Sequence, residues 1–189
     1  MGKGALIVVD VQRDFCEGGA LAAADTLSLL GPLVSCVEEA RRRGMKIVFT
    51  QDWHPTAHSS FKVNGGPWPV HCVAESAGAE LMPPLTARAE DLVVHKGVAV
   101  DGQGYSGFEA TGLAGQLRDA GVDRVAVTGI ATEYCVRATA MDAAKAGFST
   151  VVISDLVRAV QESAVGSAME EMRAAGVRVE SSAEWLKSI

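Results

Sequence analysis

Hydrophobic and polar positions alternate along the chain as short apolar runs separated by longer amphipathic stretches. The apolar runs are rich in β-branched residues and fall at residues 5–9, 46–50, 91–95, 124–128, 150–154 and 177–180. Several of them are almost continuously apolar, which is typical of strands buried on both faces of a parallel sheet. The pattern therefore predicts six buried strands.

The stretches between these runs carry apolar residues at helical spacing, and a glycine follows each of them. They cover residues 26–43, 112–120, 132–146 and 161–175, followed by Gly44, Gly121, Gly147 and Gly176. Glycine is the residue that most often ends a helix in the left-handed conformation. The alternation predicts one α/β domain over residues 1–189, with a three-layer α/β/α architecture and a six-stranded, mostly parallel sheet.

Composition narrows the class of protein. The chain has 189 residues, of which 48% are hydrophobic and 21% charged, and this balance favours a folded globular domain over a disordered chain. The net charge of −6 offers no basic surface for nucleic acid or anionic lipid. The apolar run at 5–9 is too short for a membrane span or a signal segment. We expect neither a nucleic-acid nor a membrane partner, and association into a homo-oligomer stays open.

Cysteine usage points to a reducing compartment. The four cysteines form no Cys-x-x-Cys pair, and a chain of this length needs no disulfide to stabilise its core. The sequence therefore predicts reduced thiols and a cytoplasmic protein.

Chemically capable side chains follow the first four predicted strands. Asp10 ends the first apolar run, Asp52 comes just after the second, and Lys96 follows the third. Cys135 lies a few residues beyond the fourth, in the first turn of a predicted helix. Ligands of open parallel sheets bind outside the carboxyl ends of the strands. We therefore expect these side chains to converge at one edge of the sheet.

Each of these residues also has a plain structural interpretation. Cys135 could be a buried core cysteine, and position alone weighs this evenly against a nucleophile. If Thr132 caps the helix, the positive helix end would lower the pKa of the thiol. Asp10 could cap a loop instead of acting as a base, and Lys96 could be a solvated surface lysine.

A second group of residues has the spacing of a metal site. Asp52, His54 and His58 lie close together in the sequence, and His71 follows. In an extended segment Asp52 and His54 point the same way and can share an ion. Two histidines and a carboxylate leave coordination positions open, and Zn²⁺, Fe²⁺ and Mn²⁺ all suit them. The alternative is that these histidines only pack in a loop.

Residues 102–107 match the Gly-x-Gly-x-x-Gly pattern of dinucleotide-binding proteins. That pattern requires a strand directly before it and a helix directly after it. Residues 96–101 separate it from the preceding strand, and residues 108–112 are a poor helix start. A dinucleotide site is therefore disfavoured.

Taken together, these segments resemble the nicotinamidase/pyrazinamidase group of the isochorismatase-like cysteine hydrolases. The matching segments are residues 10–15 with Gly18 and Gly19, then 52–55, 58–61, 68–72, 96–97, 105–108 and 129–136. They span most of the chain. One departure is Glu133, where the family more often has aspartate.

The resemblance implies a fold and a reaction. The fold would be isochorismatase-like with Rossmann-like topology. The reaction would convert nicotinamide, a small-molecule substrate, into nicotinate and ammonia through a thioester, in NAD salvage, and would extend to pyrazinamide. One divalent ion would be the cofactor, with Zn²⁺ first and Fe²⁺ or Mn²⁺ as alternatives.

The resemblance also assigns roles to residues. Cys135 would be the nucleophile, Asp10 the general base and acid, and Lys96 the third member of the triad. A cis peptide would precede Ala131. The other implied groups are the oxyanion hole from backbone N–H groups of Ala131 and Cys135, the metal ligands Asp52, His54 and His71 with His58 as a further candidate, and the substrate walls Phe15, Trp68, Tyr105 and Tyr134.

Three other functions compete with this one. The first is an isochorismatase-like hydrolase acting on a different amide. The second is a catalytically silent metal-binding or regulatory α/β domain, which would have no chemical need for Asp10, Lys96 and Cys135 together. The third is a dinucleotide-binding module built on the glycines of residues 102–107.

Overall fold

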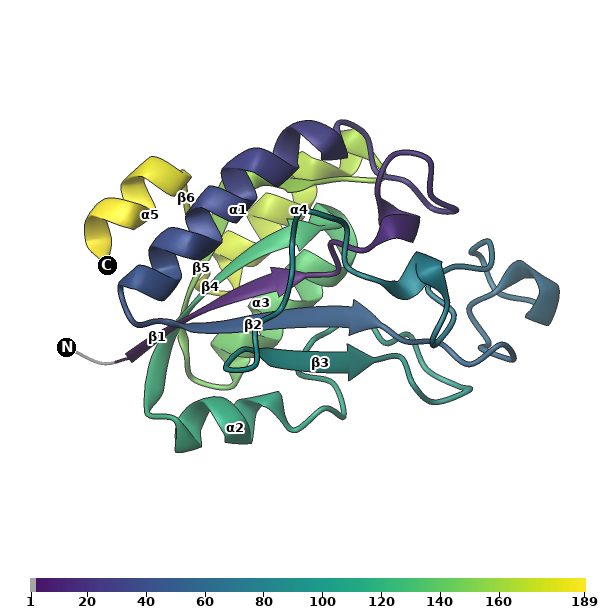
Figure 1. Ribbon diagram of the computed structural model, residues 1–189, viewed down its shortest axis with the longest axis horizontal. Helices are drawn as coiled ribbons and strands as arrows, with labels where there is room; N and C mark the ends of the chain where they lie inside the picture. Colours follow the sequence, from purple (N-terminus) through teal and green to yellow (C-terminus); the bar gives the residue numbers. More distant parts are fainter. Residues whose placement is uncertain (1–2) are drawn as a thin grey trace.

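A computed structural model of the protein, described here for residues 3–189, is built around one six-stranded sheet (Figure 1). The strands are β1 (Lys3–Val9), β2 (Lys46–Asp52), β3 (Leu92–Lys96), β4 (Val122–Ile130), β5 (Ser149–Arg158) and β6 (Arg178–Glu180). All neighbouring strands pair in parallel, in the order β3-β2-β1-β4-β5-β6. The prediction of a six-stranded α/β fold is confirmed, and the sheet is entirely parallel.

The α-helices are α1 (Thr26–Arg42), α2 (Leu113–Asp119), α3 (Arg137–Lys145), α4 (Val165–Ala174) and α5 (Ser182–Ser188). The predicted helix at 132–146 is in fact two elements, because a π-helical turn, η4 (Thr132–Val136), precedes α3. The segment 161–175 likewise begins with a short 3-10 turn, η5 (Glu162–Ala164). Three further 3-10 turns are η1 (Arg13–Phe15), η2 (Lys62–Asn64) and η3 (Ala77–Ala79). The pattern analysis did not predict α5.

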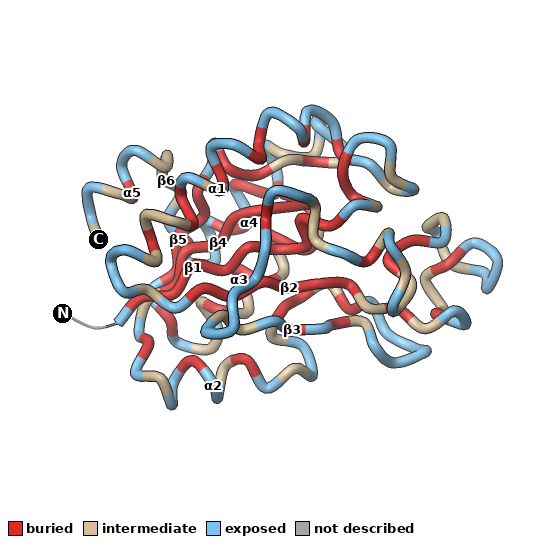
Figure 2. Tube along the Cα trace, viewed as in Figure 1, coloured by how far each residue is buried: buried red, intermediate tan, exposed pale blue. Residues whose placement is uncertain are grey.

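The side chains of alternate β1 residues belong to two hydrophobic cores, one on each face of the sheet. Leu6 and Val8 pack with α1 and with Trp185 of α5. Ala5, Ile7 and Val9 pack on the other face with apolar side chains of α2, α3 and α4. Figure 2 shows the strands buried between these layers. This arrangement explains why the strands read as continuous apolar runs rather than as alternating ones.

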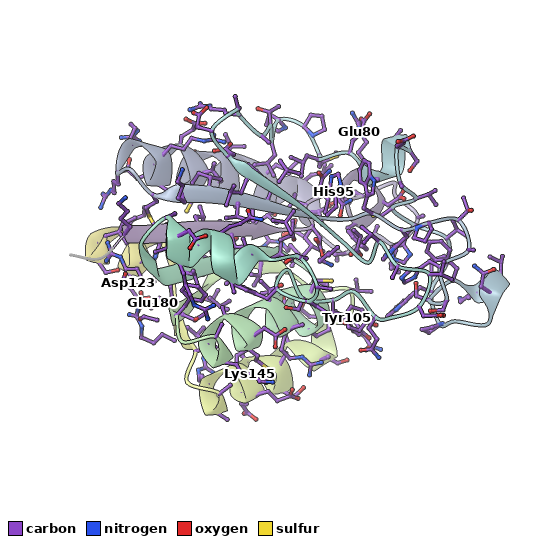
Figure 3. The ribbon with its side chains drawn as sticks, turned by 90° about the horizontal axis from the view of Figure 1, so that it is seen from below. Glu80, His95, Tyr105, Asp123, Lys145 and Glu180 are labelled. Atoms are coloured by element: carbon purple, nitrogen blue, oxygen red, sulfur yellow. The ribbon has the colours of Figure 1, made fainter. Side chains whose placement is uncertain are left out.

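The strand order reverses at β1, which pairs with β2 on one side and β4 on the other. Crevices at such a reversal are where open α/β sheets bind ligands. The long loops lie at the carboxyl ends of the strands, on the right in Figure 1. Figure 3 shows Tyr105 toward this loop-rich end and Asp123, at the start of β4, toward the opposite end.

None of the helices within residues 3–189 has both the length and the apolar composition needed to cross a membrane.

Candidate active site

The carboxyl edge of the sheet brings together the four residues that follow the first four strands. Asp10 directly follows β1, Asp52 ends β2, Lys96 ends β3, and Cys135 lies in η4 beyond β4. All four are buried, with at most 5% of each residue exposed. Asp10 and Cys135 come from the two strands that flank the reversal of strand order, so the site lies where the topology favours ligand binding.

The Lys96 ammonium group is the centre of a buried ionic cluster. Its Nζ lies 2.8 Å from Asp10 Oδ2, 2.5 Å from Asp52 Oδ1 and 3.4 Å from Cys135 Sγ. It also donates a hydrogen bond of 2.8 Å to the carbonyl of Gly104. A buried ammonium group is stable only with such partners, and here two carboxylates and a carbonyl surround it. Lys96 is therefore not a solvated surface lysine.

Asp10 is held in place by the neighbouring strand. The Thr50 hydroxyl donates a hydrogen bond of 2.7 Å to Asp10 Oδ1, and the Asp10 N–H donates to the Thr50 carbonyl at 3.2 Å. Its backbone has a φ of 49°, which is unusual for a residue other than glycine. These contacts keep Asp10 Oδ2 directed at Lys96, with the Cys135 thiol close by.

The two carboxylates beside Lys96 differ in their tendency to take a proton. Burial raises the pKa of the Asp10 carboxyl above its usual range, with the Lys96 ammonium opposing the shift and the Asp52 carboxylate adding to it. Burial acts on Asp52 in the same direction, but Lys96 and His54 outweigh it and hold the pKa of Asp52 below its usual range. Asp10 is therefore the carboxylate suited to accept and return a proton.

The environment of Cys135 differs from what the sequence predicted. Burial raises the pKa of the Cys135 thiol well above its usual value; the Lys96 ammonium opposes this shift and the Asp10 carboxylate adds to it. The expected lowering by a helix end is wrong, because desolvation dominates at this buried position. Thr132 is not the N-cap either, because Ala131 precedes the turn and no side chain caps it. A protonated thiol needs a base before it can attack.

Asp52, His54 and His71 form a second cluster that shares Asp52 with the first. Their ligand atoms lie within 4.8 Å of one another, and all three residues are buried. The Nε2 atoms of His54 and His71 lie 3.4 Å and 4.0 Å from Asp52 Oδ2. Asp52 thus offers Oδ1 to Lys96 and Oδ2 to the histidines.

The orientation of the two histidines fits a divalent metal ion. His54 Nδ1 donates to the Gly97 carbonyl at 2.9 Å, and His71 Nδ1 donates to the Pro69 carbonyl at 2.8 Å. A carbonyl can only accept, so each ring carries a proton on Nδ1, and Nε2, the nitrogen that faces Asp52, is the one that could bind a metal ion. Two imidazole nitrogens and one carboxylate are a donor set that suits Zn²⁺, Fe²⁺ and Mn²⁺.

His58 lies beside this cluster without being one of its three converging donors. Its ring centroid is 4.0 Å from that of His54, and its Nδ1 lies 2.7 Å from Ser60 Oγ. The residue is fully buried, and its Nε2 has no hydrogen-bond partner among the described residues. Burial and the neighbouring His54 lower the pKa of His58 to about 4, so the ring is neutral. Its role as a further ligand stays a prediction. His95, in contrast, stacks on Trp53 with ring centroids 4.1 Å apart.

A pocket with aromatic walls opens over both clusters. Its lining includes all four predicted wall residues, which are Phe15, Trp68, Tyr105 and Tyr134. Asp52, His54, His71, Ala131 and Cys135 also line it. Trp68 Nε1 donates a hydrogen bond of 3.1 Å to the Tyr105 hydroxyl, and the Trp68 ring meets Tyr134 edge-on at 5.1 Å. The peptide bond between Ile130 and Ala131 is cis, as the resemblance implied.

Several lining residues were not singled out from the sequence. Leu21, Ser60, Gln103 and Val160 also face this pocket. Ser60 lies within a matched motif and could have been named from it. Leu21 and Val160 come from segments with no chemical signal, so only the three-dimensional packing shows their place.

The glycine-rich segment 102–107 is a loop between β3 and α2 and not a strand–turn–helix junction. Gly104 has a φ of +63°, and a Cβ there would lie 2.6 Å from Gly97 Cα. Its carbonyl accepts the hydrogen bond from Lys96. The loop therefore packs against the ionic cluster, which explains its glycine without a dinucleotide.

The fold and this arrangement of side chains define a cysteine-hydrolase type of site on a parallel α/β sheet. The chain belongs to the isochorismatase family, because the model of the isochorismatase domain matches residues 4–184. The resemblance seen in the sequence motifs is thereby confirmed.

Relatives within the family share most of the chain. It is 42% identical to the nicotinamidase/pyrazinamidase of Mycobacterium tuberculosis, over 93% of this chain and 97% of that protein. The crystal structure of the pyrazinamidase of Pyrococcus horikoshii in complex with zinc superimposes with a TM-score of 0.91 at 42% identity, covering 95% of this chain and 99% of that one. A structure of PnC1 from L. infantum in complex with nicotinate gives 0.88 at 40% identity, covering 96% and 94%.

Proposed function

We propose that this protein is a metal-dependent nicotinamidase, a cysteine amidohydrolase that converts nicotinamide into nicotinate and ammonia and also accepts pyrazinamide. One observation carries the proposal. The buried Asp10–Lys96–Cys135 cluster lies beside the Asp52–His54–His71 cluster, and Cys135 lines the same aromatic-walled pocket as the three candidate metal ligands. The relatives named nicotinamidase or pyrazinamidase, one of them bound to zinc and another to nicotinate, support it.

The first half of the reaction uses Asp10 and Cys135. Asp10 takes the thiol proton as Cys135 Sγ attacks the amide carbon, because burial leaves the resting thiol protonated. Asp10 then returns this proton to the amide nitrogen. The carbon–nitrogen bond breaks, ammonia leaves, and the acyl group remains on Cys135 as a thioester.

The second half repeats the proton transfers with water. Asp10 accepts a proton from a water molecule, whose oxygen forms a bond to the thioester carbon. The carbon–sulfur bond breaks, Asp10 returns the proton to Cys135, and the acid product leaves as nicotinate after losing its own proton to the solvent. A carboxyl whose pKa burial raises is suited to both directions of this transfer.

Backbone and ammonium groups stabilise charge during both halves. We assign the oxyanion hole to the N–H groups of Ala131 and Cys135, two residues that line the pocket beside the thiol. Lys96 stays protonated, since its pKa lies well above the usual value: burial opposes this shift, and Asp10 and Asp52 outweigh burial. The Lys96 ammonium group therefore orients Asp10 and neutralises the buried carboxylates.

Asp52, His54 and His71 would hold one divalent ion, for which we propose Zn²⁺ with Fe²⁺ or Mn²⁺ as alternatives, and His58 is a candidate further ligand. An ion bound there would supply an electrophilic anchor for a ring nitrogen of the substrate. Phe15, Trp68, Tyr105 and Tyr134 would enclose the flat ring, which fixes the carboxamide over Cys135.

The need for a reduced thiol nucleophile bears on the cellular setting of the protein. We propose that the whole chain, residues 1–189, forms one hydrolase domain that acts in NAD salvage. Its nucleophile must stay a thiol, and all four cysteines are free and buried. A reducing compartment such as the cytoplasm suits such a nucleophile.

The test is release of ammonia from nicotinamide by the purified protein, with pyrazinamide and benzamide in parallel. Benzamide has the same shape as nicotinamide and lacks the ring nitrogen. We expect hydrolysis of the first two amides and little of benzamide. Absence of nicotinamide hydrolysis by metal-loaded protein, or equal turnover of benzamide, would contradict the proposal.

A further inference from the structure

The side-chain amide of Gln12 is completely buried and makes three hydrogen bonds, none of which the reaction uses directly. Its Oε1 accepts from the Asp52 N–H at 2.8 Å, and its Nε2 donates to the Asp52 carbonyl at 2.9 Å. The same Nε2 donates to the Ala79 carbonyl at 2.9 Å. The amide group thus engages both polar groups of the Asp52 main chain.

This contact lies beyond the end of β1, where the regular pairing of β1 with β2 has stopped. The last residues paired between the two strands are Val9 and Thr50. The Gln12 side chain continues the connection to Asp52 by imitating the donor and acceptor of a neighbouring strand. Because Gln12 is two residues from Asp10, it also ties the segment of the proposed base to the residue shared by both clusters.

The position of the Asp52 main chain matters because each of its two carboxylate oxygens faces a different partner. Its Oδ1 contacts Lys96 Nζ at 2.5 Å, and its Oδ2 faces His54 Nε2 at 3.4 Å. A small rotation of the Asp52 main chain would move both oxygens together. Groups that orient a metal ligand in this way commonly change metal affinity about 10- to 100-fold when removed.

We propose that Gln12 is a positioning residue for the metal centre, which sets metal affinity by fixing the main chain of Asp52. The inference rests on the metal site of the proposed function. Gln12 touches neither the substrate pocket nor the reacting atoms, and it acts only through Asp52.

The test compares two glutamines that share one acceptor. Gln51 is also buried, and its Nε2 donates to the Ala79 carbonyl at 2.8 Å, but its side chain makes no hydrogen bond to Asp52. Gln12→Met and Gln51→Met each remove one amide donor from Ala79 and keep a side chain of similar length. Only Gln12→Met releases Asp52.

Zinc affinity of each purified protein is measured by competition with a chromophoric chelator. We expect Gln12→Met to bind Zn²⁺ about 10- to 100-fold more weakly than the wild type, with Gln51→Met close to the wild type. Raising the free zinc concentration should restore kcat in Gln12→Met, which a general loss of structure would not allow. Equal zinc affinity in all three proteins would overturn the proposal, as would equal losses in both variants.

A second variant covers the case in which Gln12→Met does not fold. Gln12→Glu keeps the shape and the acceptor for the Asp52 N–H, and it directs a carboxylate at the carbonyls of Asp52 and Ala79. We expect the same weakening of zinc binding, and wild-type affinity in this variant would overturn the proposal.

Zinc binding is measured in the absence of substrate. The experiments can therefore refute the proposed reaction and the role of Gln12 independently of each other. A wild type that binds zinc through Gln12-dependent geometry and hydrolyses no nicotinamide would refute the proposed reaction alone. A wild-type nicotinamidase whose zinc affinity is indifferent to Gln12 would refute this inference alone.

Discussion

The two halves of the candidate site share Asp52 and are built differently. In the ionic half, Asp10 follows β1 and Lys96 ends β3, so the sheet itself positions both side chains. In the metal half, His54 and His71 come from the loops after β2, and each ring is fixed by a backbone carbonyl. The ionic half already pairs its charges, whereas the metal half directs two ring nitrogens at one carboxylate oxygen.

This difference indicates how each half depends on its central cation. Lys96 is part of the folded chain, and its removal would leave two carboxylates buried without a partner. A metal ion is a removable cation, and each of the two histidines that would hold it keeps one ring nitrogen bonded to a backbone carbonyl without it. We expect loss of Lys96 to damage the fold and loss of the metal to damage mainly the reaction.

The largest effect is expected at the nucleophile. Cys135→Ala should lower nicotinamide hydrolysis by about 10⁴- to 10⁶-fold, because no other group can form the thioester. Ammonia release measures this loss, and thermal unfolding should show that the fold is kept. Cys36→Ala, which changes a buried free cysteine of α1, is the matched control and should stay active. Substantial turnover by Cys135→Ala would contradict the cysteine mechanism.

Removal of Lys96 tests the ionic half. Lys96→Met should reduce the free energy of unfolding by about 3–5 kcal/mol, because Asp10 and Asp52 stay buried without their cation. Chemical denaturation measures this change. Adding Asp10→Asn to Lys96→Met should recover part of the stability by removing one uncompensated charge. A loss below about 1 kcal/mol, the size expected of an exposed ion pair, would show that the cluster does not stabilise the fold.

Removal of the metal tests the other half. Chelation should lower activity at least about 100-fold, more than loss of an outer-shell group costs, and added Zn²⁺, Fe²⁺ or Mn²⁺ should restore it. His54→Ala should lose the ion, as metal analysis of the purified protein would show. His95→Ala is the control, because His95 stacks on Trp53 outside the ligand set. Full activity in metal-free protein would rule out the metal's role.

The two halves also differ in how far the sequence predicts them. The strand ends at Asp10, Asp52 and Lys96 could be located because apolar runs mark buried strands and parallel strands end at one edge. The contact of Gln12 with Asp52 could not be predicted from the sequence, and neither could the place of Val160 in the pocket wall. Both depend on how irregular segments of the chain pack back against the sheet.

The thiol of Cys135 shows a further limit. Its place after β4 was predictable, but the direction of its pKa shift was not. Position along a helix suggests a lowered pKa, whereas burial raises the pKa of this thiol, and only the surrounding packing determines that burial. Local pattern thus locates the reactive group, and the three-dimensional environment sets its protonation.

The smallest effect is expected in the aromatic wall above the two halves. The Tyr105 hydroxyl accepts the hydrogen bond from Trp68 Nε1, and Tyr105→Phe removes this acceptor while keeping the ring. A lost hydrogen bond of this kind costs about 0.5–1.5 kcal/mol, so KM for nicotinamide should rise about 2- to 10-fold as Trp68 loses its fixed position. We expect kcat to change little, because the hydrogen bond of the Tyr105 hydroxyl joins it to Trp68, which belongs to neither cluster.

Tyr134→Phe is the matched control, since Tyr134 packs edge-on against the Trp68 ring and does not accept its N–H. Its KM should stay within about twofold of the wild-type value, because the phenylalanine ring keeps the edge-on packing against Trp68 and the Trp68 N–H keeps its acceptor. A fall in kcat with unchanged KM in Tyr105→Phe would instead place Tyr105 in the reaction itself. Equal rises in KM for both variants would show that the wall binds the ring by hydroxyl contacts rather than by the fixed position of Trp68.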